Sequence, residues 1–243
     1  MKQVYFFGDG KAEGSAGDKN LLGGKGANLA EMTTLGIPVP PGLTISTKVC
    51  TQFMDTGVYP EHLNTDVQNA LSIVEEIMGQ KFGDPKNPLL VSVRSGARQS
   101  MPGMMETVLN VGLTSKSIPG LIEKSGDERF VYDAYRRLIT MYADVVMEKA
   151  ADIELQESVG IREKLDGIME KMKHHKRVEN DSELSAESLM ELCYLFKMEI
   201  SKNNREEFPD DPHAQLWGAI TAVFKSWNGK RAVSYRNIEN ISH

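Results

Sequence analysis

The pattern of hydrophobic and polar positions divides the chain into a mixed first part and a helical remainder. Short apolar runs bounded by polar and glycine residues predict strands at residues 4–7, 43–45, 89–94 and 108–111. Apolar residues three and four positions apart predict helices at residues 27–34, 47–56 and 61–79, the last burying Val67, Leu71, Val74 and Met78. The polar, glycine-rich stretch 8–20 is predicted to be a loop. We therefore expect an α/β fold of the α+β kind with a small mixed sheet.

From residue 118 onward the periodicity becomes helical and predicts a large helical excursion from this sheet. Segment 129–147 places five apolar residues on one stripe, which predicts a buried face: Phe130, Ala134, Leu138, Met141 and Val145. Further helices are predicted at residues 161–172, directly after Ser185 as an N-cap, and at residues 213–227. These helices by themselves indicate packing and no chemistry.

The segment LLGGKGANLAEMTTLGIPVPP, residues 21–41, places Lys25 among glycines at the start of a predicted helix. Unpaired N–H groups and the helix dipole favour an anion at such a position, and lysine adds a full positive charge. The segment does not match a Walker loop, because Lys19 stands at the first glycine position and Gly26 replaces the serine or threonine. Taken alone, a solvated lysine in a glycine turn explains the pattern equally well.

The segment LLVSVRSGARQSMPGMMET, residues 89–107, joins a predicted strand to Arg94 and then to a loop with small residues such as Gly103 and Thr107. Glycine and other small residues let backbone amides approach a polyphosphate closely. The alternative is a glycine-rich hairpin with a solvated arginine. A cation at a strand end, followed by such a loop, is also typical of a phosphate site.

Together, LLGGKGANLAEMTTLGIPVPPGLTIS and LLVSVRSGARQSMPGMMETVLNVGL resemble the N-terminal ATP-binding domain of the pyruvate, phosphate dikinases, which are PEP-utilising enzymes. Residues 129–147, 206–209 and 222–236 also resemble that family, so the resemblance runs along the whole chain. It implies a nucleotide-binding fold of the ATP-grasp type. It also implies that Lys25 and Arg94 contact ATP phosphates, and that Gly103, Met105 and Thr107 belong to the loop that covers them.

The same resemblance implies a domain organisation and a reaction. Residues 1–113 plus 203–243 would form the first ATP-grasp subdomain, and residues 114–202 an inserted helical subdomain. The implied reaction converts ATP, phosphate and pyruvate to AMP, diphosphate and phosphoenolpyruvate through a phosphohistidine. That histidine, the second ATP-grasp half and a pyruvate-binding domain are expected elsewhere in a larger, homodimeric enzyme, so the isolated chain is expected to be inactive.

Two other functions stay open at this point. Phosphoenolpyruvate synthases and antibiotic phosphotransferases share the GGKGANL segment, although they typically differ after the arginine that corresponds to Arg94. A phosphoenolpyruvate synthase or related phosphotransferase is therefore one alternative. The other is a non-catalytic module that binds a nucleotide or a partner protein.

No catalytic residue and no metal ligand is predicted within the chain. Mg²⁺ is expected as a cofactor of the full enzyme, with its ligands outside this segment. The five histidines lie in polar helical or terminal contexts and are interpreted as surface residues: His62, His174, His175, His213 and His243.

Net charge, cysteine content and apolar runs bear on the binding partners and the location of the protein. A net charge of −6 and an isoelectric point of about 5.5 argue against broad nucleic-acid binding. Cys50 and Cys193 lie among apolar neighbours and are predicted to be reduced, buried thiols. No signal peptide and no membrane-length apolar run is evident, so a cytoplasmic location is expected.

Overall fold

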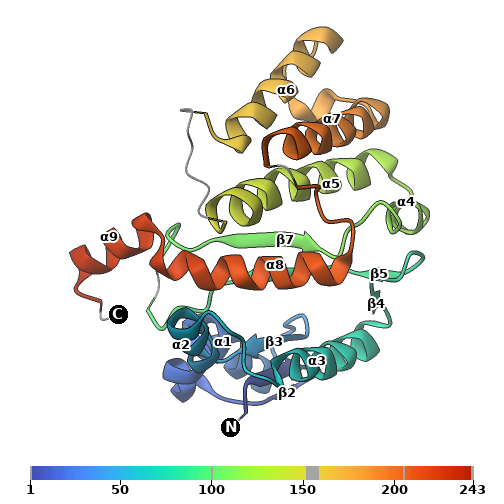
Figure 1. Ribbon diagram of the computed structural model, residues 1–243. Helices are drawn as coiled ribbons and strands as arrows, with labels where there is room; N and C mark the ends of the chain where they lie inside the picture. The colour runs from blue at the N-terminus through green and yellow to red at the C-terminus, as the bar shows by residue number, and fades with distance from the viewer. Residues whose placement is uncertain (1, 100, 152–158, 205, 242–243) are drawn as a thin grey trace. The chain divides into compact units, whose positions relative to one another are not determined.

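The computed structural model describes residues 2–99, 101–151, 159–204 and 206–241. It contains many helices and few, short strands, which confirms the predicted α/β fold class (Figure 1). The described strands form one three-stranded and two two-stranded sheets, where a single mixed sheet was expected. The chain divides into two compact units: Met1–Phe82, Arg94–Glu106 and Val223–His243 in the first, and Gly83–Val93 and Thr107–Ala222 in the second.

The first unit is built on an antiparallel sheet in the order β2-β1-β3, formed by β1 (Val4–Gly8), β2 (Lys11–Ala12) and β3 (Gly42–Ile45). Three helices accompany it: α1 (Lys19–Thr34), α2 (Thr47–Thr56) and α3 (Leu63–Met78). α3 buries Val67, Leu71 and Val74, as its spacing predicted. Met78 is 42% exposed instead of buried, because the helix ends there and Gly79 turns the chain into the left-handed region.

The predicted loop at residues 8–20 is more ordered than expected. It contains β2, a 3₁₀ turn (Ala16–Asp18) and the first residues of α1. Ser15 and Asp18 form a capping box, in which the Gly17 N–H donates to Ser15 Oγ (3.3 Å) and the Ser15 N–H donates to the Asp18 carboxylate (2.8 Å). The prediction was wrong because these reciprocal bonds stabilise a short turn that has no apolar periodicity.

Further segments complete the first unit: β4 (Lys81–Phe82), a 3₁₀ turn (Ser226–Asn228) and α9 (Lys230–Glu239). The guanidinium of Arg236 lies 4.1 Å from the ring centroid of Trp227. Arg236 is almost completely buried, and burial lowers the pKa of its guanidinium. This stacked pair joins α9 to the turn that precedes it.

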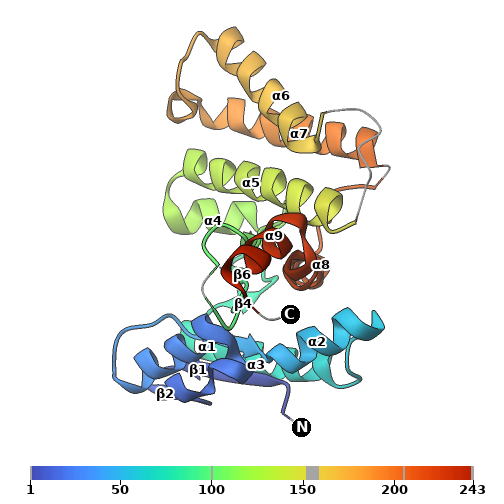
Figure 2. The same cartoon turned by 90° about the vertical axis from the view of Figure 1, so that its left-hand side faces the viewer.

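The second unit begins with three short strands: β5 (Pro88–Leu89), β6 (Val91–Arg94) and β7 (Thr107–Val111). Helices and turns follow: α4 (Ile118–Ser125), α5 (Glu128–Tyr142), a π-helical turn (Ala143–Lys149), α6 (Ile161–Lys176), a 3₁₀ turn (Asp181–Glu183), α7 (Ala186–Asn204) and α8 (Pro212–Lys225). The last residue of β6 and the last three residues of α8 belong to the first unit. α5 and α7 lie side by side, and α6 packs on α7 (Figure 2). Leu138, Leu192 and Phe196 are buried in this helical core.

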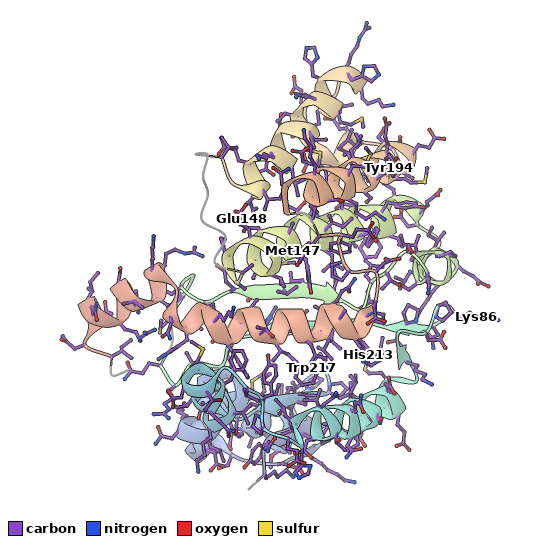
Figure 3. The ribbon with its side chains drawn as sticks, viewed as in Figure 1. Lys86, Met147, Glu148, Tyr194, His213 and Trp217 are labelled. Atoms are coloured by element: carbon purple, nitrogen blue, oxygen red, sulfur yellow. The ribbon has the colours of Figure 1, made fainter. Side chains whose placement is uncertain are left out.

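The helical predictions for the second unit were mostly confirmed. Ser185 caps α7, since the Ser188 N–H donates to its Oγ at 3.2 Å. Phe130 was wrongly placed on the buried stripe and is 61% exposed. Repeated steps of four residues exceed the 3.6-residue turn, so that the first member of the stripe rotates away from the core. On α7, Tyr194 also faces outward, whereas Met147 is buried at the π-helical turn (Figure 3).

None of the described helices is long and apolar enough to cross a membrane. The division into residues 1–113 plus 203–243 and residues 114–202 follows the family resemblance and stays a prediction.

Candidate functional site

A kink at Gly23 interrupts α1 two residues before Lys25. Gly23 has φ 70° and ψ 171°, a region of backbone space that is essentially restricted to glycine. A Cβ atom there would lie 1.3 Å from the carbonyl oxygen of Gly96, so no side chain fits. The helix restarts after the kink, and the exposed Lys25 lies in the first turn of its second half.

The two glycine-rich segments meet through their backbones. The Gly24 N–H donates to the Ala97 carbonyl oxygen at 2.9 Å, next to the close approach of Gly23 and Gly96. We call these four residues the glycine contact. Lys25 follows Gly24 directly, and Arg94 precedes Gly96 by two residues. The glycine contact therefore joins the two backbone segments that carry Lys25 and Arg94, the predicted phosphate-binding cations.

This junction changes one expectation about the helix start. Unpaired amides were expected near Lys25, but the Gly24 N–H is not one of them, because it donates to the Ala97 carbonyl. Gly26 also has a structural role, since a Cβ atom on it would lie 2.7 Å from Cγ2 of Thr44 in β3. The glycine that replaces the Walker hydroxyl thus lets α1 lie close against the sheet.

Residues 101–106, which we call the covering loop, begin with a tight turn. Met101 is buried, and its carbonyl accepts the Met104 N–H at 3.2 Å. Pro102 and Gly103 occupy the central positions, and Gly103 has φ +72°, as the third position of a type II turn requires. Gly103 is exposed with open space around it, and Met105 is half-buried. The middle of the covering loop thus presents its backbone outward.

The far end of the covering loop is anchored by a contact that was not predicted. The Glu106 carboxylate accepts a hydrogen bond from Arg231 Nη2 at 2.6 Å, and the Glu106 N–H donates weakly to Ser226 Oγ at 3.5 Å. No sequence signal connects positions so far apart. Thr107, the remaining predicted loop residue, is the first residue of β7 and belongs to the second unit.

Arg98 is a further cation that was not predicted. It is exposed, and its carbonyl oxygen lies 3.5 Å from the position that a Cβ atom on Gly24 would occupy. The backbone of Arg98 is therefore part of the same junction as Lys25. The sequence could have indicated Arg98, because it lies four residues after Arg94 in the same glycine-containing segment.

The described residues contain no cluster of three His, Cys, Asp or Glu side chains that could hold a metal ion. Four histidines are exposed, as expected for surface residues: His62, His174, His175 and His213. His243 lies outside the described residues. The residues around the glycine contact thus offer cations and amides to a ligand, without a carboxylate set for Mg²⁺.

Both cysteines are free thiols, as predicted. Burial raises the pKa of Cys193 to about 12 and the pKa of Cys50 to about 11. Cys193 is buried, whereas Cys50 is only half-buried, which corrects the expectation that both are fully enclosed. Neither thiol has the depressed pKa of a reactive nucleophile.

Comparison with known proteins gives consistent matches along the whole chain. The sequence model of a family described as "Pyruvate phosphate dikinase, AMP/ATP-binding domain" matches residues 19–64 and 56–243. A pyruvate, phosphate dikinase from Rhizobium meliloti is 49% identical over 99% of this chain and 26% of the relative, and one from Clostridium symbiosum is 46% identical over the same shares. The chloroplastic pyruvate, phosphate dikinase 1 of Arabidopsis thaliana is 49% identical over 100% of this chain and 24% of its own length. The chain thus spans about a quarter of the length of these relatives.

Proposed function

Because the chain belongs to the family of pyruvate phosphate dikinase AMP/ATP-binding domains, we propose that it binds ATP at the glycine contact. The observation that supports this most is the backbone junction of Gly23 and Gly24 with Gly96 and Ala97. It joins two cation-bearing segments that are distant in the sequence. A charged ligand with several anionic groups is the natural partner of such an arrangement.

Each proposed ligand residue supplies a different kind of interaction. Lys25 would provide a mobile point charge near the helix start, and Arg94 a planar fork that can hold two phosphate oxygens. Gly103 and Met105 would contribute backbone amides of the covering loop, and Thr107 a hydroxyl or amide at its end. Phosphoryl transfer depends mainly on such positioning and charge neutralisation, so these groups would prepare ATP for reaction.

For the longer protein we propose the dikinase reaction that the family resemblance implies. ATP, phosphate and pyruvate would yield AMP, diphosphate and phosphoenolpyruvate through a phosphohistidine that is expected outside this chain. Mg²⁺ would assist ATP in the complete enzyme, and the described residues contain no group of three His, Cys, Asp or Glu side chains that could hold it. A homodimer in the cytoplasm is part of the same proposal, and two thiols without a disulfide are compatible with a reducing compartment.

Isothermal titration of the chain with ATP tests the binding site. Lys25→Ala and Arg94→Ala are each expected to weaken ATP binding by about tenfold, the size of a lost charge-assisted hydrogen bond. Lys19→Ala is the matched control, because Lys19 is also an exposed lysine of α1 and precedes the kink. Unchanged ATP affinity in both variants would refute the site assignment.

The alternatives give different results. A non-catalytic module for a protein partner predicts no ATP binding by the wild-type chain. A phosphoenolpyruvate synthase predicts that the full-length protein forms phosphoenolpyruvate from ATP and pyruvate without added phosphate as co-substrate. Product analysis of the full-length protein with and without phosphate separates the synthase from the dikinase.

A further inference from the structure

The covering loop is held at both ends and open in the middle. At its start, Met101 is buried and closes the turn to Met104. At its end, Glu106 is bound through its side chain to Arg231 and through its N–H to Ser226. Between these points the backbone at Gly103 is exposed. The orientation of the backbone at Gly103 therefore depends on how the two ends of the loop are held. At the Glu106 end, the ion pair with Arg231 is a stronger interaction than the hydrogen bond to Ser226.

We propose that Glu106 and Arg231 are positioning residues for nucleotide binding, acting through the amides of Gly103 and Met105. This inference rests on the proposed function, since it assumes that the covering loop meets ATP phosphates. A loop containing glycine loses more conformational freedom on binding than a loop that is already fixed. By fixing the end of the loop before ATP arrives, the ion pair lowers that entropic penalty.

The charges of the pair add a second effect. Glu106 places a carboxylate only three residues from Gly103, in a loop proposed to lie over phosphates. A negative charge there repels ATP, and the positive charge of Arg231 at 2.6 Å weakens that repulsion. The Glu106 side chain is only 19% exposed, so water screens the charge poorly, whereas the Arg231 side chain is 59% exposed. The two single variants should therefore differ: loss of arginine leaves the repulsion, and loss of glutamate removes it.

ATP titration of single and double variants of the chain tests this difference. Arg231→Gln is expected to weaken ATP binding about tenfold and Glu106→Gln about threefold, since only the first keeps the negative charge of Glu106 while removing the positive charge of Arg231. The exchange variant Glu106→Arg with Arg231→Glu is expected to recover binding to within about threefold of wild type, because the tie is re-formed. Arg137→Gln is the matched control: Arg137 is 63% exposed and pairs with Asp133 at 2.8 Å in the second unit.

Amide hydrogen exchange without ATP gives an independent measurement. Arg231→Gln is expected to speed exchange at Gly103–Met105 by about tenfold and to leave the helices unchanged, because only the tie at Glu106 is lost. Arg231→Lys, which keeps the charge, is expected to lie between wild type and Arg231→Gln in both measurements. It also serves as the test if Arg231→Gln does not fold.

The outcomes separate this inference from the proposed function. Wild-type affinity together with unchanged loop exchange in Arg231→Gln would overturn the positioning role. Equal losses in Glu106→Gln and Arg231→Gln, without recovery in the exchange variant, would also overturn it. If the wild-type chain binds no ATP, the proposed function fails, and with it the effect on nucleotide; hydrogen exchange then still shows whether the ion pair fixes the loop.

Discussion

Two regions of the molecule are stabilised in opposite ways: the glycine contact within the first unit and the helical core within the second. At the glycine contact, backbone meets backbone, and the absence of a side chain at Gly23 is what allows it. In the core of α5 and α7, large side chains such as Leu192 and Phe196 fill the space between helices. The first arrangement keeps cations and amides at the surface with a fixed backbone beneath them. The second fills the interior of its unit with apolar side chains.

The largest effect is expected from adding a side chain at the glycine contact. Gly23→Ala places a Cβ atom 1.3 Å from the Gly96 oxygen and forces alanine into a glycine-only conformation. We expect the free energy of unfolding of the first unit to fall by about 4 kcal/mol or more, with loss of ATP binding. Urea unfolding followed by Trp227 fluorescence, in a Trp217→Phe background, measures the free energy of unfolding of the first unit.

Gly36→Ala is the control for backbone strain alone. Gly36 also has a positive φ of +77°, but no atom lies within 4 Å of the position of its Cβ atom. It should lower stability by about 1 kcal/mol and leave ATP binding unchanged. Equal losses of stability in Gly23→Ala and Gly36→Ala would mean that the close approach of Gly23 to Gly96 adds nothing to the cost of placing alanine at a positive φ.

A smaller and purely structural effect is expected in the helical core. Leu192→Ala leaves a cavity between α5 and α7 and should lower the stability of the second unit by about 3 kcal/mol, measured through Trp217 fluorescence in a Trp227→Phe background. ATP affinity of the folded protein should stay at the wild-type value. Met190→Ala on the same helix, at a side chain that is 47% exposed, should change stability by less than about 0.5 kcal/mol. A loss of ATP affinity in folded Leu192→Ala would contradict the contrast between the two regions.

The smallest effect, and the one that depends on pH, concerns an ion cluster on α5. Arg136 and Arg137 both donate to the carboxylate of Asp133, at 2.6 and 2.8 Å. Burial raises the pKa of Asp133, but the hydrogen bonds and charges of the two arginines outweigh it and lower the pKa below its ordinary value. Because the folded-state pKa is the lower one, the stabilisation is complete above the unfolded-state pKa and is lost as the pH falls through the folded-state pKa.

Asp133→Asn should therefore reduce the free energy of unfolding by about 2 kcal/mol at pH 7, where the carboxylate is charged. The difference from wild type should shrink as the pH falls below about 4, the ordinary range of an aspartate. Urea unfolding at pH 7, 5 and 3 measures this. Arg137→Gln, which removes only the exposed partner, should change stability by less than about 1 kcal/mol at pH 7. A difference between wild type and Asp133→Asn that does not vary with pH would show that the asparagine acts through packing.

The sequence predicted the elements that depend on local patterns. The buried face of α3 and the N-cap at Ser185 follow from apolar spacing and capping chemistry, which act within a few residues. Met78 was misplaced because it lies at a helix end, and Phe130 because repeated steps of four residues rotate away from the buried face of the helix. The turn at Ser15 was missed because hydrogen bonds alone stabilise it.

For the candidate site, both segments could be located in the sequence, but the way they are joined could not. Glycines at positions 23 and 96 indicate unusual backbone, yet they do not specify which backbone approaches which. The same holds for Glu106 and Arg231, because any acid and any base in the chain could form an ion pair equally well on sequence grounds. Long-range contacts of this kind depend on the tertiary fold, which the local pattern does not contain.

The bond from the Gly24 amide to the Ala97 carbonyl also constrains the order in which the protein can be assembled on the ribosome. The N-terminal half of α1 leaves the exit tunnel well before residue 97 is synthesised, and the partner of Glu106 follows only with residue 231. Closing such distant contacts is slow compared with forming a helix. The nascent chain must therefore carry an incomplete first unit while the second is translated. Nascent chains stalled before residue 97 has left the exit tunnel and after it has left should differ in their protection from protease at the Gly23 kink.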